Sequence, residues 1–220
     1  MKTYTINKPE ELKQFKNKFG YYVDGNLIAN CNLDIERYLR ADGFIKADKF
    51  IKAKWDIEAG KFIKTNGFIK TNSYIKADGF IKAVKFIKAN RFIKAGEDIE
   101  SGGYIEAGGP IEAGGSIIAG KGILAESCIT CKGTLKAGGK IFAGYCTWRE
   151  ITDEEKTITC EKLIGGKVEY GILNETLKGK NLTRKELKKL YNLVEKTETK
   201  PDLIVDGKFY KEITSSKEEQ

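Results

Sequence analysis

The chain contains no histidine, and this limits the chemistry that its side chains could perform. Histidine is the usual general base near neutral pH and the commonest metal ligand, so Ser-His and Cys-His nucleophile pairs and His-ligated metal sites are excluded. The groups left for catalysis are carboxylates, lysine, tyrosine and five cysteines. None of them forms a spacing specific to a reaction. We therefore predict no enzymatic activity and no cofactor.

A six-residue repeat organises the middle of the chain. An aliphatic residue recurs at every sixth position from Leu27 to Ile141, which makes 20 hexads. A small residue, usually alanine, follows two positions later, and a pair such as Gly-Gly, Asp-Gly or Asn-Gly separates one predicted strand from the next. A strand presents the same side at every second residue, so the aliphatic and the small residue face inward together. Each hexad is therefore predicted to be one short strand and one corner.

Stacked coils of such strands make a β-solenoid, and we predict a mainly β fold of this kind. Three hexads per coil would give between six and seven coils, and two hexads per coil is the alternative. The domains are predicted as an N-terminal α/β cap (1–20), the solenoid (21–147) and a small C-terminal α+β cap (148–220). The first cap would hold a strand at 3–6 and a helix at 9–18. The second would hold a hairpin of 157–163 with 167–173, a helix after the capping box of Thr183 and Glu186, and a hairpin at 203–210.

The same register decides how the CxxC sequence is interpreted. Cys131 occupies the inward small position and Cys128 an outward one, so the two thiols point to opposite sides and we predict no metal or dithiol site.

Trp148 and Arg149 stand where the repeat ends, and we predict a packing plug there, with a contact site as the second interpretation. An odd number of cysteines, no apolar signal region and no apolar run of membrane length favour a soluble, cytoplasmic protein that does not contact a membrane.

The outward positions change character along the chain. Residues 43–95 hold 13 lysines and arginines against four acids, whereas residues 96–144 hold four lysines against six acids. In the first of these segments an aromatic residue usually precedes the inward aliphatic and a lysine follows it. We predict that this array binds a partner through Phe44, Lys46, Phe50, Lys52, Phe62, Lys64, Phe68, Lys70, Tyr74, Lys76, Phe80, Lys82, Phe86, Lys88, Arg91, Phe92 and Lys94.

Two interpretations of this array stay open. Aromatic rings beside cations suit a protein or ribonucleoprotein partner, or nucleic acid itself through base stacking and phosphate neutralisation. Alternatively, the rings stack between coils while the lysines keep the surface soluble.

Two segments of the repeat resemble small hexapeptide-repeat β-helix proteins encoded by phages and mobile elements of Gram-positive bacteria, namely GGYIEAGGPIEAGG and KIFAGYCTWR. This resemblance covers residues 27–149 and implies a non-catalytic inhibitor of host defence, of the anti-CRISPR type, acting on an effector or its guide RNA. The x-Ile-x-Ala strands also resemble bactofilins, which implies a self-assembling scaffold as the alternative. Hexapeptide acyltransferases match poorly, since their small inward residue precedes the aliphatic and their catalytic histidine is absent here.

Overall fold

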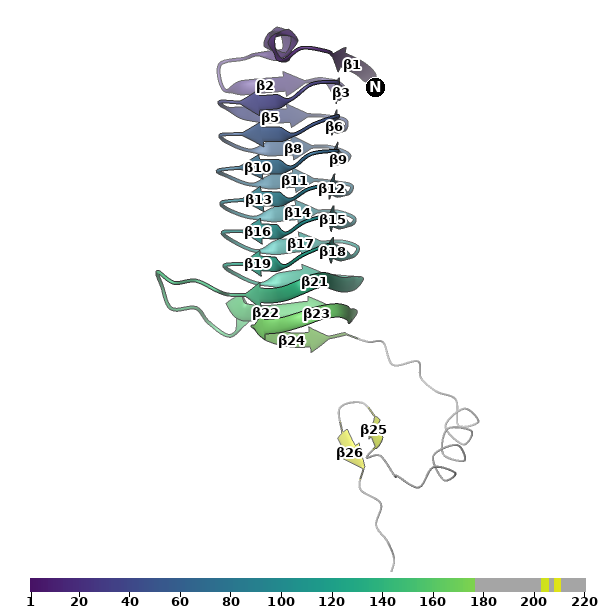
Figure 1. Ribbon diagram of the computed structural model, residues 1–220, viewed down its shortest axis with the longest axis vertical. Helices are drawn as coiled ribbons and strands as arrows, with labels where there is room; N and C mark the ends of the chain where they lie inside the picture. Colours follow the sequence, from purple (N-terminus) through teal and green to yellow (C-terminus); the bar gives the residue numbers. More distant parts are fainter. Residues whose placement is uncertain (177–202, 206–207, 211–220) are drawn as a thin grey trace, which may run out of the picture. The chain divides into compact units, whose positions relative to one another are not determined.

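The computed structural model describes residues 1–176 and the strands at 203–205 and 208–210. Residues 1–176 form one compact unit, a β-solenoid of about 9 turns with parallel strands (Figure 1). Between residues 20 and 143 the strands pair in register with strands 18 residues away, as Ile69 does with Ile87. Three hexads therefore close one coil, and the predicted fold is confirmed. None of the helices in the described residues has the length and apolar character that crossing a membrane requires.

The coils stack their strands into three faces. Face 1 contains β1 (Lys2–Ile6), β3 (Gly25–Ala29), β6 (Ile45–Ala47), β9 (Ile63–Thr65), β12 (Ile81–Ala83), β15 (Ile99–Ser101), β18 (Ile117–Ala119) and the first half of β21 (Thr134–Ala143). Face 2 contains β4 (Leu33–Ile35), β7 (Ile51–Ala53), β10 (Ile69–Thr71), β13 (Ile87–Ala89), β16 (Ile105–Ala107), β19 (Ile123–Ala125) and the second half of β21. Face 3 contains β2 (Gly20–Val23), β5 (Tyr38–Ala41), β8 (Ile57–Ala59), β11 (Ile75–Ala77), β14 (Ile93–Ala95), β17 (Ile111–Ala113), β20 (Ile129–Cys131), β22 (Thr157–Cys160) and β24 (Ile172–Glu175).

The interior is built from the two inward positions of each hexad. The inward aliphatic residues, one per hexad from Ile45 to Ile141, are buried, and the alanines two residues after them are nearly so. Burying each isoleucine contributes about 1.5–3 kcal/mol, and the same column is extended by every coil. Three small positions carry a hydroxyl instead, at Thr65, Thr71 and Ser101, and each hydroxyl donates to a carbonyl of the preceding coil. Polar residues are thus tolerated inside where a corner carbonyl accepts a hydrogen bond from their hydroxyl.

Some corner positions leave no room for a side chain. Corner N–H groups donate to the coil before them, as Gly96 N does to Ala77 O at 3.0 Å. A Cβ on Gly96 would lie 1.9 Å from the carbonyl oxygen of Asp78, which explains glycine at this corner.

The N-terminal cap differs from the prediction in its helix. Residues Pro9–Phe15 form a 3-10 helix, η1, rather than an α-helix reaching residue 18. The strands β1 and β2 already belong to the stacked sheets, so the segment between them must cross one face of the first coil within 13 residues. Leu12 of η1 is buried, and Phe15 contacts Tyr4 edge to face at 4.9 Å. This short helix occupies the place in the chain of the first face 2 strand.

The solenoid continues beyond residue 147, where we predicted its end. The hairpin predicted over 157–173 is wrong, because β22 pairs parallel with β20 and with β24, and β23 (Lys162–Tyr170) pairs parallel with β21. The sequence Ile-Thr-Cys at 158–160 repeats that at 129–131 and takes the same inward places. Gly166, with φ +93°, lies where β23 bends rather than in a hairpin turn.

A second compact unit comprises residues 177–220. Its predicted hairpin at 203–210 is confirmed, as β25 (Leu203–Val205) and β26 (Lys208–Tyr210) pair antiparallel. The helix predicted after Thr183 lies outside the described residues, and the capping role of this unit stays a prediction.

Candidate binding surface

The outward lysines form one column on each face. Face 1 carries Lys46, Lys64 and Lys82 in register, and face 2 carries Lys52, Lys70 and Lys88. On face 3, Lys76 and Lys94 are preceded by Arg40 and Glu58. The single basic array expected from the chain order is thus divided among three faces.

All three columns change sign at the same level of the solenoid. Lys82 pairs with Glu100, Lys88 with Glu106 at 2.5 Å, and Lys94 with Glu112 at 2.6 Å. Lys52 is also paired, with Asp34 at 3.0 Å. Within residues 1–176, the lysines without a carboxylate oxygen inside 4.0 Å include Lys46, Lys49, Lys64, Lys70 and Lys85.

These five lysines lie on faces 1 and 2 or on the edge between them. Over 44–53, 62–71 and 80–89, which are the three coils of these faces, the chain has eight lysines and one acid, Asp48. Face 3 of the same coils is balanced, since Asp56 and Glu58 offset Lys76 and Lys94. We call the basic surface the lysine edge; it comprises Lys46, Lys49, Lys52, Lys64, Lys70, Lys82, Lys85 and Lys88.

The aromatic residues stack on one another between coils, as one of the two interpretations predicted. Phe50, Phe68, Phe86 and Tyr104 form a column on face 2 with ring centroids 4.7–4.9 Å apart and interplanar angles of 2–7°. Face 1 has a column of three rings and face 3 a pair, namely Phe44, Phe62 and Phe80, and Tyr74 with Phe92. A base needs about 3.4 Å on each of its sides, as in a stacked duplex, so no base fits between these rings. The rings are half-buried and offer mainly their edges to a partner.

The structure therefore brings together twelve of the predicted residues and separates five. Tyr74, Lys76, Phe92 and Lys94 lie on face 3, and Arg91 lies at the corner between faces 2 and 3. Sequence reasoning missed Lys49 and Lys85, which complete the lysine edge. The sequence feature that could have identified these two lysines is their place in the corner pair between two strands that each carry an outward lysine.

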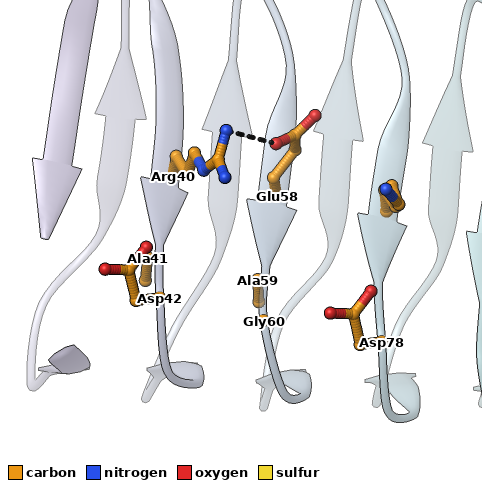
Figure 2. A pocket seen from close by; sticks show the side chains of 8 residues that line it. Arg40, Ala41, Asp42, Glu58, Ala59, Gly60 and Asp78 are labelled. Atoms are coloured by element: carbon orange, nitrogen blue, oxygen red, sulfur yellow. Dashed lines mark ion pairs between the residues drawn. The ribbon is translucent and has the colours of Figure 1, made fainter. Parts of the chain in front are cut away.

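A shallow hollow of about 120 Å³ on face 3 contains charges of both signs (Figure 2). It exists because Gly60 has no side chain between Asp42 and Asp78. Glu58 pairs with Arg40 at 3.6 Å and accepts a hydrogen bond from the Tyr74 hydroxyl. Burial and this bond raise the pKa of Tyr74. The carboxylate of Glu58 is thus already engaged, which is unlike a general base awaiting a substrate.

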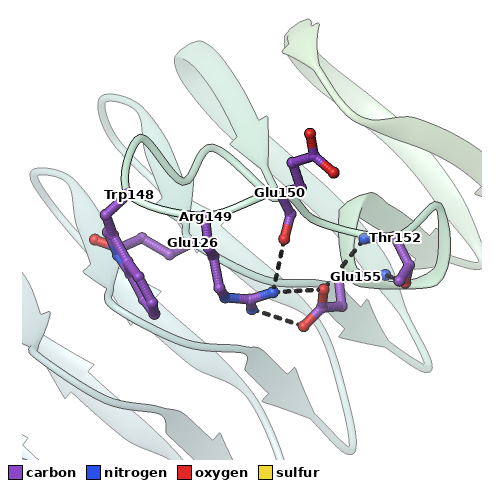
Figure 3. A network of polar contacts seen from close by, with 6 residues as sticks. All are labelled: Glu126, Trp148, Arg149, Glu150, Thr152 and Glu155. Atoms are coloured by element: carbon purple, nitrogen blue, oxygen red, sulfur yellow. Dashed lines mark hydrogen bonds and ion pairs between the residues drawn. The ribbon is translucent and has the colours of Figure 1, made fainter.

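An insertion interrupts the last coils. Cys160 follows Cys131 by 29 residues instead of 18, and the additional residues lie in the loop 144–156 between β21 and β22. Arg149 makes two hydrogen bonds to the Glu155 carboxylate, at 2.7 and 2.8 Å (Figure 3). The Glu155 carboxylate also accepts the Thr152 N–H at 3.2 Å, while the Glu155 N–H donates to Thr152 Oγ1 at 3.4 Å. The Arg149 bonds, more than the backbone bond, lower the pKa of Glu155 to about 2.

Trp148 is held on the outside of this loop, so the predicted packing plug is wrong. Its indole is 72% exposed, its Nε1–H donates to Glu126 at 3.2 Å, and Arg149 lies over its ring at 5.4 Å. These contacts fix the ring's position without burying it.

The cysteines follow the predicted register. Cys131 and Cys160 are buried in the inward column of face 3, and Cys128 is half-buried on the outside. Burial raises the pKa of the Cys131 thiol to about 12, so its reactive thiolate is suppressed.

Comparison with protein-family models, with curated proteins and with solved structures finds no match to this chain.

Proposed function

We propose that this chain is a non-catalytic binding protein whose lysine edge docks on the phosphates of nucleic acid held by a protein complex, and thereby blocks that complex. The observation that carries the proposal is the uneven charge. The lysine edge has eight lysines against one aspartate within its own segments, and five of these lysines have no carboxylate oxygen within 4.0 Å in residues 1–176, beside a balanced face 3. Lysines directly opposite each other on neighbouring strands repel, and a polyanion relieves this repulsion while releasing its own counterions.

The partner class follows from the resemblance to phage and mobile-element proteins. It suggests a cytoplasmic inhibitor of a nucleic-acid-handling defence effector, such as a CRISPR nuclease with its guide RNA. A scaffold that polymerises through the solenoid ends is the second candidate. It is less favoured because η1 takes the place of a strand in the first coil, which leaves that end without a complete set of strand edges.

Two matched triple variants test the surface. Lys46→Glu, Lys64→Glu and Lys70→Glu together reverse three lysines of the lysine edge that have no carboxylate partner within residues 1–176. The control, Lys61→Glu, Lys76→Glu and Arg91→Glu, makes the same change of net charge elsewhere in the same coils. Binding is measured by fluorescence anisotropy with a labelled DNA duplex and a single-stranded RNA. We expect the first triple to weaken binding by about 100-fold and the control by less than about fivefold. Equal losses, or no binding by the unmodified chain, would overturn the proposal.

The partner class needs a separate experiment. The tagged chain is expressed in a Gram-positive host carrying a CRISPR system and recovered with and without nuclease treatment. Recovery of the effector, reduced by nuclease, supports the inhibitor. Recovery of the chain alone as a large assembly contradicts it and favours the scaffold.

A further inference from the structure

Both tryptophans of the chain are exposed along one edge of the solenoid. Trp55, 59% exposed, lies in the corner between β7 and β8, where the chain passes from face 2 to face 3. The loop with Trp148 makes the same passage between β21 and β22, and Figure 1 shows it projecting on the side where the chain leaves β10, β13, β16 and β19. Exposed tryptophan is uncommon on a surface that contacts only water, and it is enriched at the centres of protein interfaces.

The corners between the two tryptophans carry mostly short side chains, with Arg91 and Glu126 as the long ones. The corner pairs are Asn72 with Ser73, Asn90 with Arg91, Gly108 with Gly109, and Glu126 with Ser127. We call this line the tryptophan edge; it comprises the corner pairs 54–55, 72–73, 90–91, 108–109 and 126–127 and the loop 144–156. Small side chains let another surface approach the backbone closely.

The two ends of the tryptophan edge differ in charge. Lys54 adjoins Trp55, with Arg37 in the coil before it, and the acids at this end are Glu36, 3.8 Å from Lys54, and Asp56, which follows Trp55, so this end is neutral overall. At the other end Trp148 donates a hydrogen bond to Glu126, and the loop 144–156 has four acids, Glu150 among them, against Arg149 and Lys156. The exposed Lys54 at one end and the acidic loop at the other are complementary when two copies meet in opposite directions.

We propose that two copies of this chain pair antiparallel along the tryptophan edge, about a two-fold axis. The loop is the fifth corner after that of Trp55, about 24 Å away at about 4.8 Å per coil. The axis then falls between the corner of Arg91 and that of Gly108 and Gly109. Trp55 of each copy meets the loop of the other, Lys54 meets Glu150, and Arg91 faces glycines instead of a second Arg91.

The contact is narrow, because two edges of the solenoids meet rather than two faces. Interfaces that bury less than about 1,200 Å² in total are typically weak, so we expect a dissociation constant of about 10–100 µM. The lysine edge lies on the opposite side of face 2 and remains open in this dimer.

Sedimentation of the full chain between about 1 and 300 µM tests the pairing. We expect a monomer–dimer equilibrium that Trp55→Ala and Trp148→Ala each weaken by at least about tenfold. Val84→Ala is the matched control, because Val84 is 58% exposed at the corner between faces 1 and 2; this variant should dimerise as the unmodified chain does. A chain that stays monomeric at 300 µM, or a dimer that neither tryptophan variant weakens, would overturn the proposal.

A charge exchange tests the antiparallel geometry. Lys54→Glu and Glu150→Lys each place like charges together in both contacts of their own dimer, so each variant alone should dimerise weakly. In an equimolar mixture of the two variants, the substituted position of one chain meets the substituted position of the other, and the two unchanged residues also meet. Both contacts of the mixed dimer then regain opposite charges, so dimerisation should recover. Failure of the mixture to recover contradicts this arrangement.

Discussion

The stacked rings of face 2 are expected to stabilise the fold rather than to bind the partner, and Phe68 is where this can be measured. Phe68 lies between two rings, Phe50 at 4.8 Å and Phe86 at 4.7 Å. Phe50 has one ring neighbour, because the corresponding position of the preceding coil is Asn32. Each stacked pair contributes about 0.5–1.5 kcal/mol beyond burial, and the half-buried ring itself about 1.5–2 kcal/mol. We therefore expect Phe68→Ala to lower the free energy of unfolding by about 3.5 kcal/mol and Phe50→Ala by about 2.5 kcal/mol.

Equilibrium unfolding in guanidinium chloride, followed by circular dichroism, measures both variants. Phe68→Leu is the control that keeps apolar bulk without a ring, and it should lie between Phe68→Ala and the unmodified chain. If Phe68→Ala costs no more than Phe50→Ala, the stacking is not a source of stability. Folded Phe68→Ala should also bind the DNA duplex with unchanged affinity, since its ring faces are covered; a large loss would mean that the ring contacts the partner.

Three further predictions concern the corners, the loop and the cysteines. Gly96→Ala should lower the free energy of unfolding by about 1–3 kcal/mol, because its Cβ would lie 1.9 Å from the Asp78 carbonyl oxygen. In the same assay Gly109→Ala should cost clearly less, because its Cβ would lie 3.3 Å from the Arg91 carbonyl group. The pKa of Glu155, about 2, lies below its ordinary value of 4.5, so the ion pair with Arg149 should persist as the pH falls from neutral and be lost only through about pH 2. Arg149→Gln should return the pKa of Glu155 toward 4.5, measured by NMR titration of the carboxyl carbon. An unchanged pKa in this variant would show that Arg149 does not cause the shift. In the native chain a thiol reagent should label Cys128 and Cys146 and spare Cys31, Cys131 and Cys160, with all five labelled after unfolding; rapid native labelling of Cys131, read by mass spectrometry, would contradict its burial.

The repeat made the fold predictable because one local rule acts in every coil. Ile and Ala two residues apart must share a side of a strand, and turn residues between them fix the corner, so 20 hexads specify the same structure repeatedly. The register also placed Cys131 inside and Cys128 outside. These conclusions needed only the period of the sequence.

The rest depended on three-dimensional spacing. The loop 144–156 interrupts the period, so the sequence pattern predicts a hairpin strand where Ile-Thr-Cys returns at Ile158, although this strand pairs parallel with β20. The division of the lysines among three faces follows from the 18-residue coil, which groups Lys46 with Lys64 and Lys76 with Lys94. Trp55 stands one residue before the aromatic position of its hexad, and this offset, visible in the sequence, is what exposes it at a corner.

The salt dependence of duplex binding tests the lysine edge most directly. For B-form DNA, the logarithm of the binding constant falls against the logarithm of the salt concentration with a slope of about −0.9 per neutralised phosphate. If Lys46, Lys64 and Lys70 each contact a phosphate, reversing all three to glutamate should make the slope shallower by about 2.7. The control triple at Lys61, Lys76 and Arg91 should leave the slope nearly unchanged. Equal slopes for the two triple variants would contradict binding through the lysine edge.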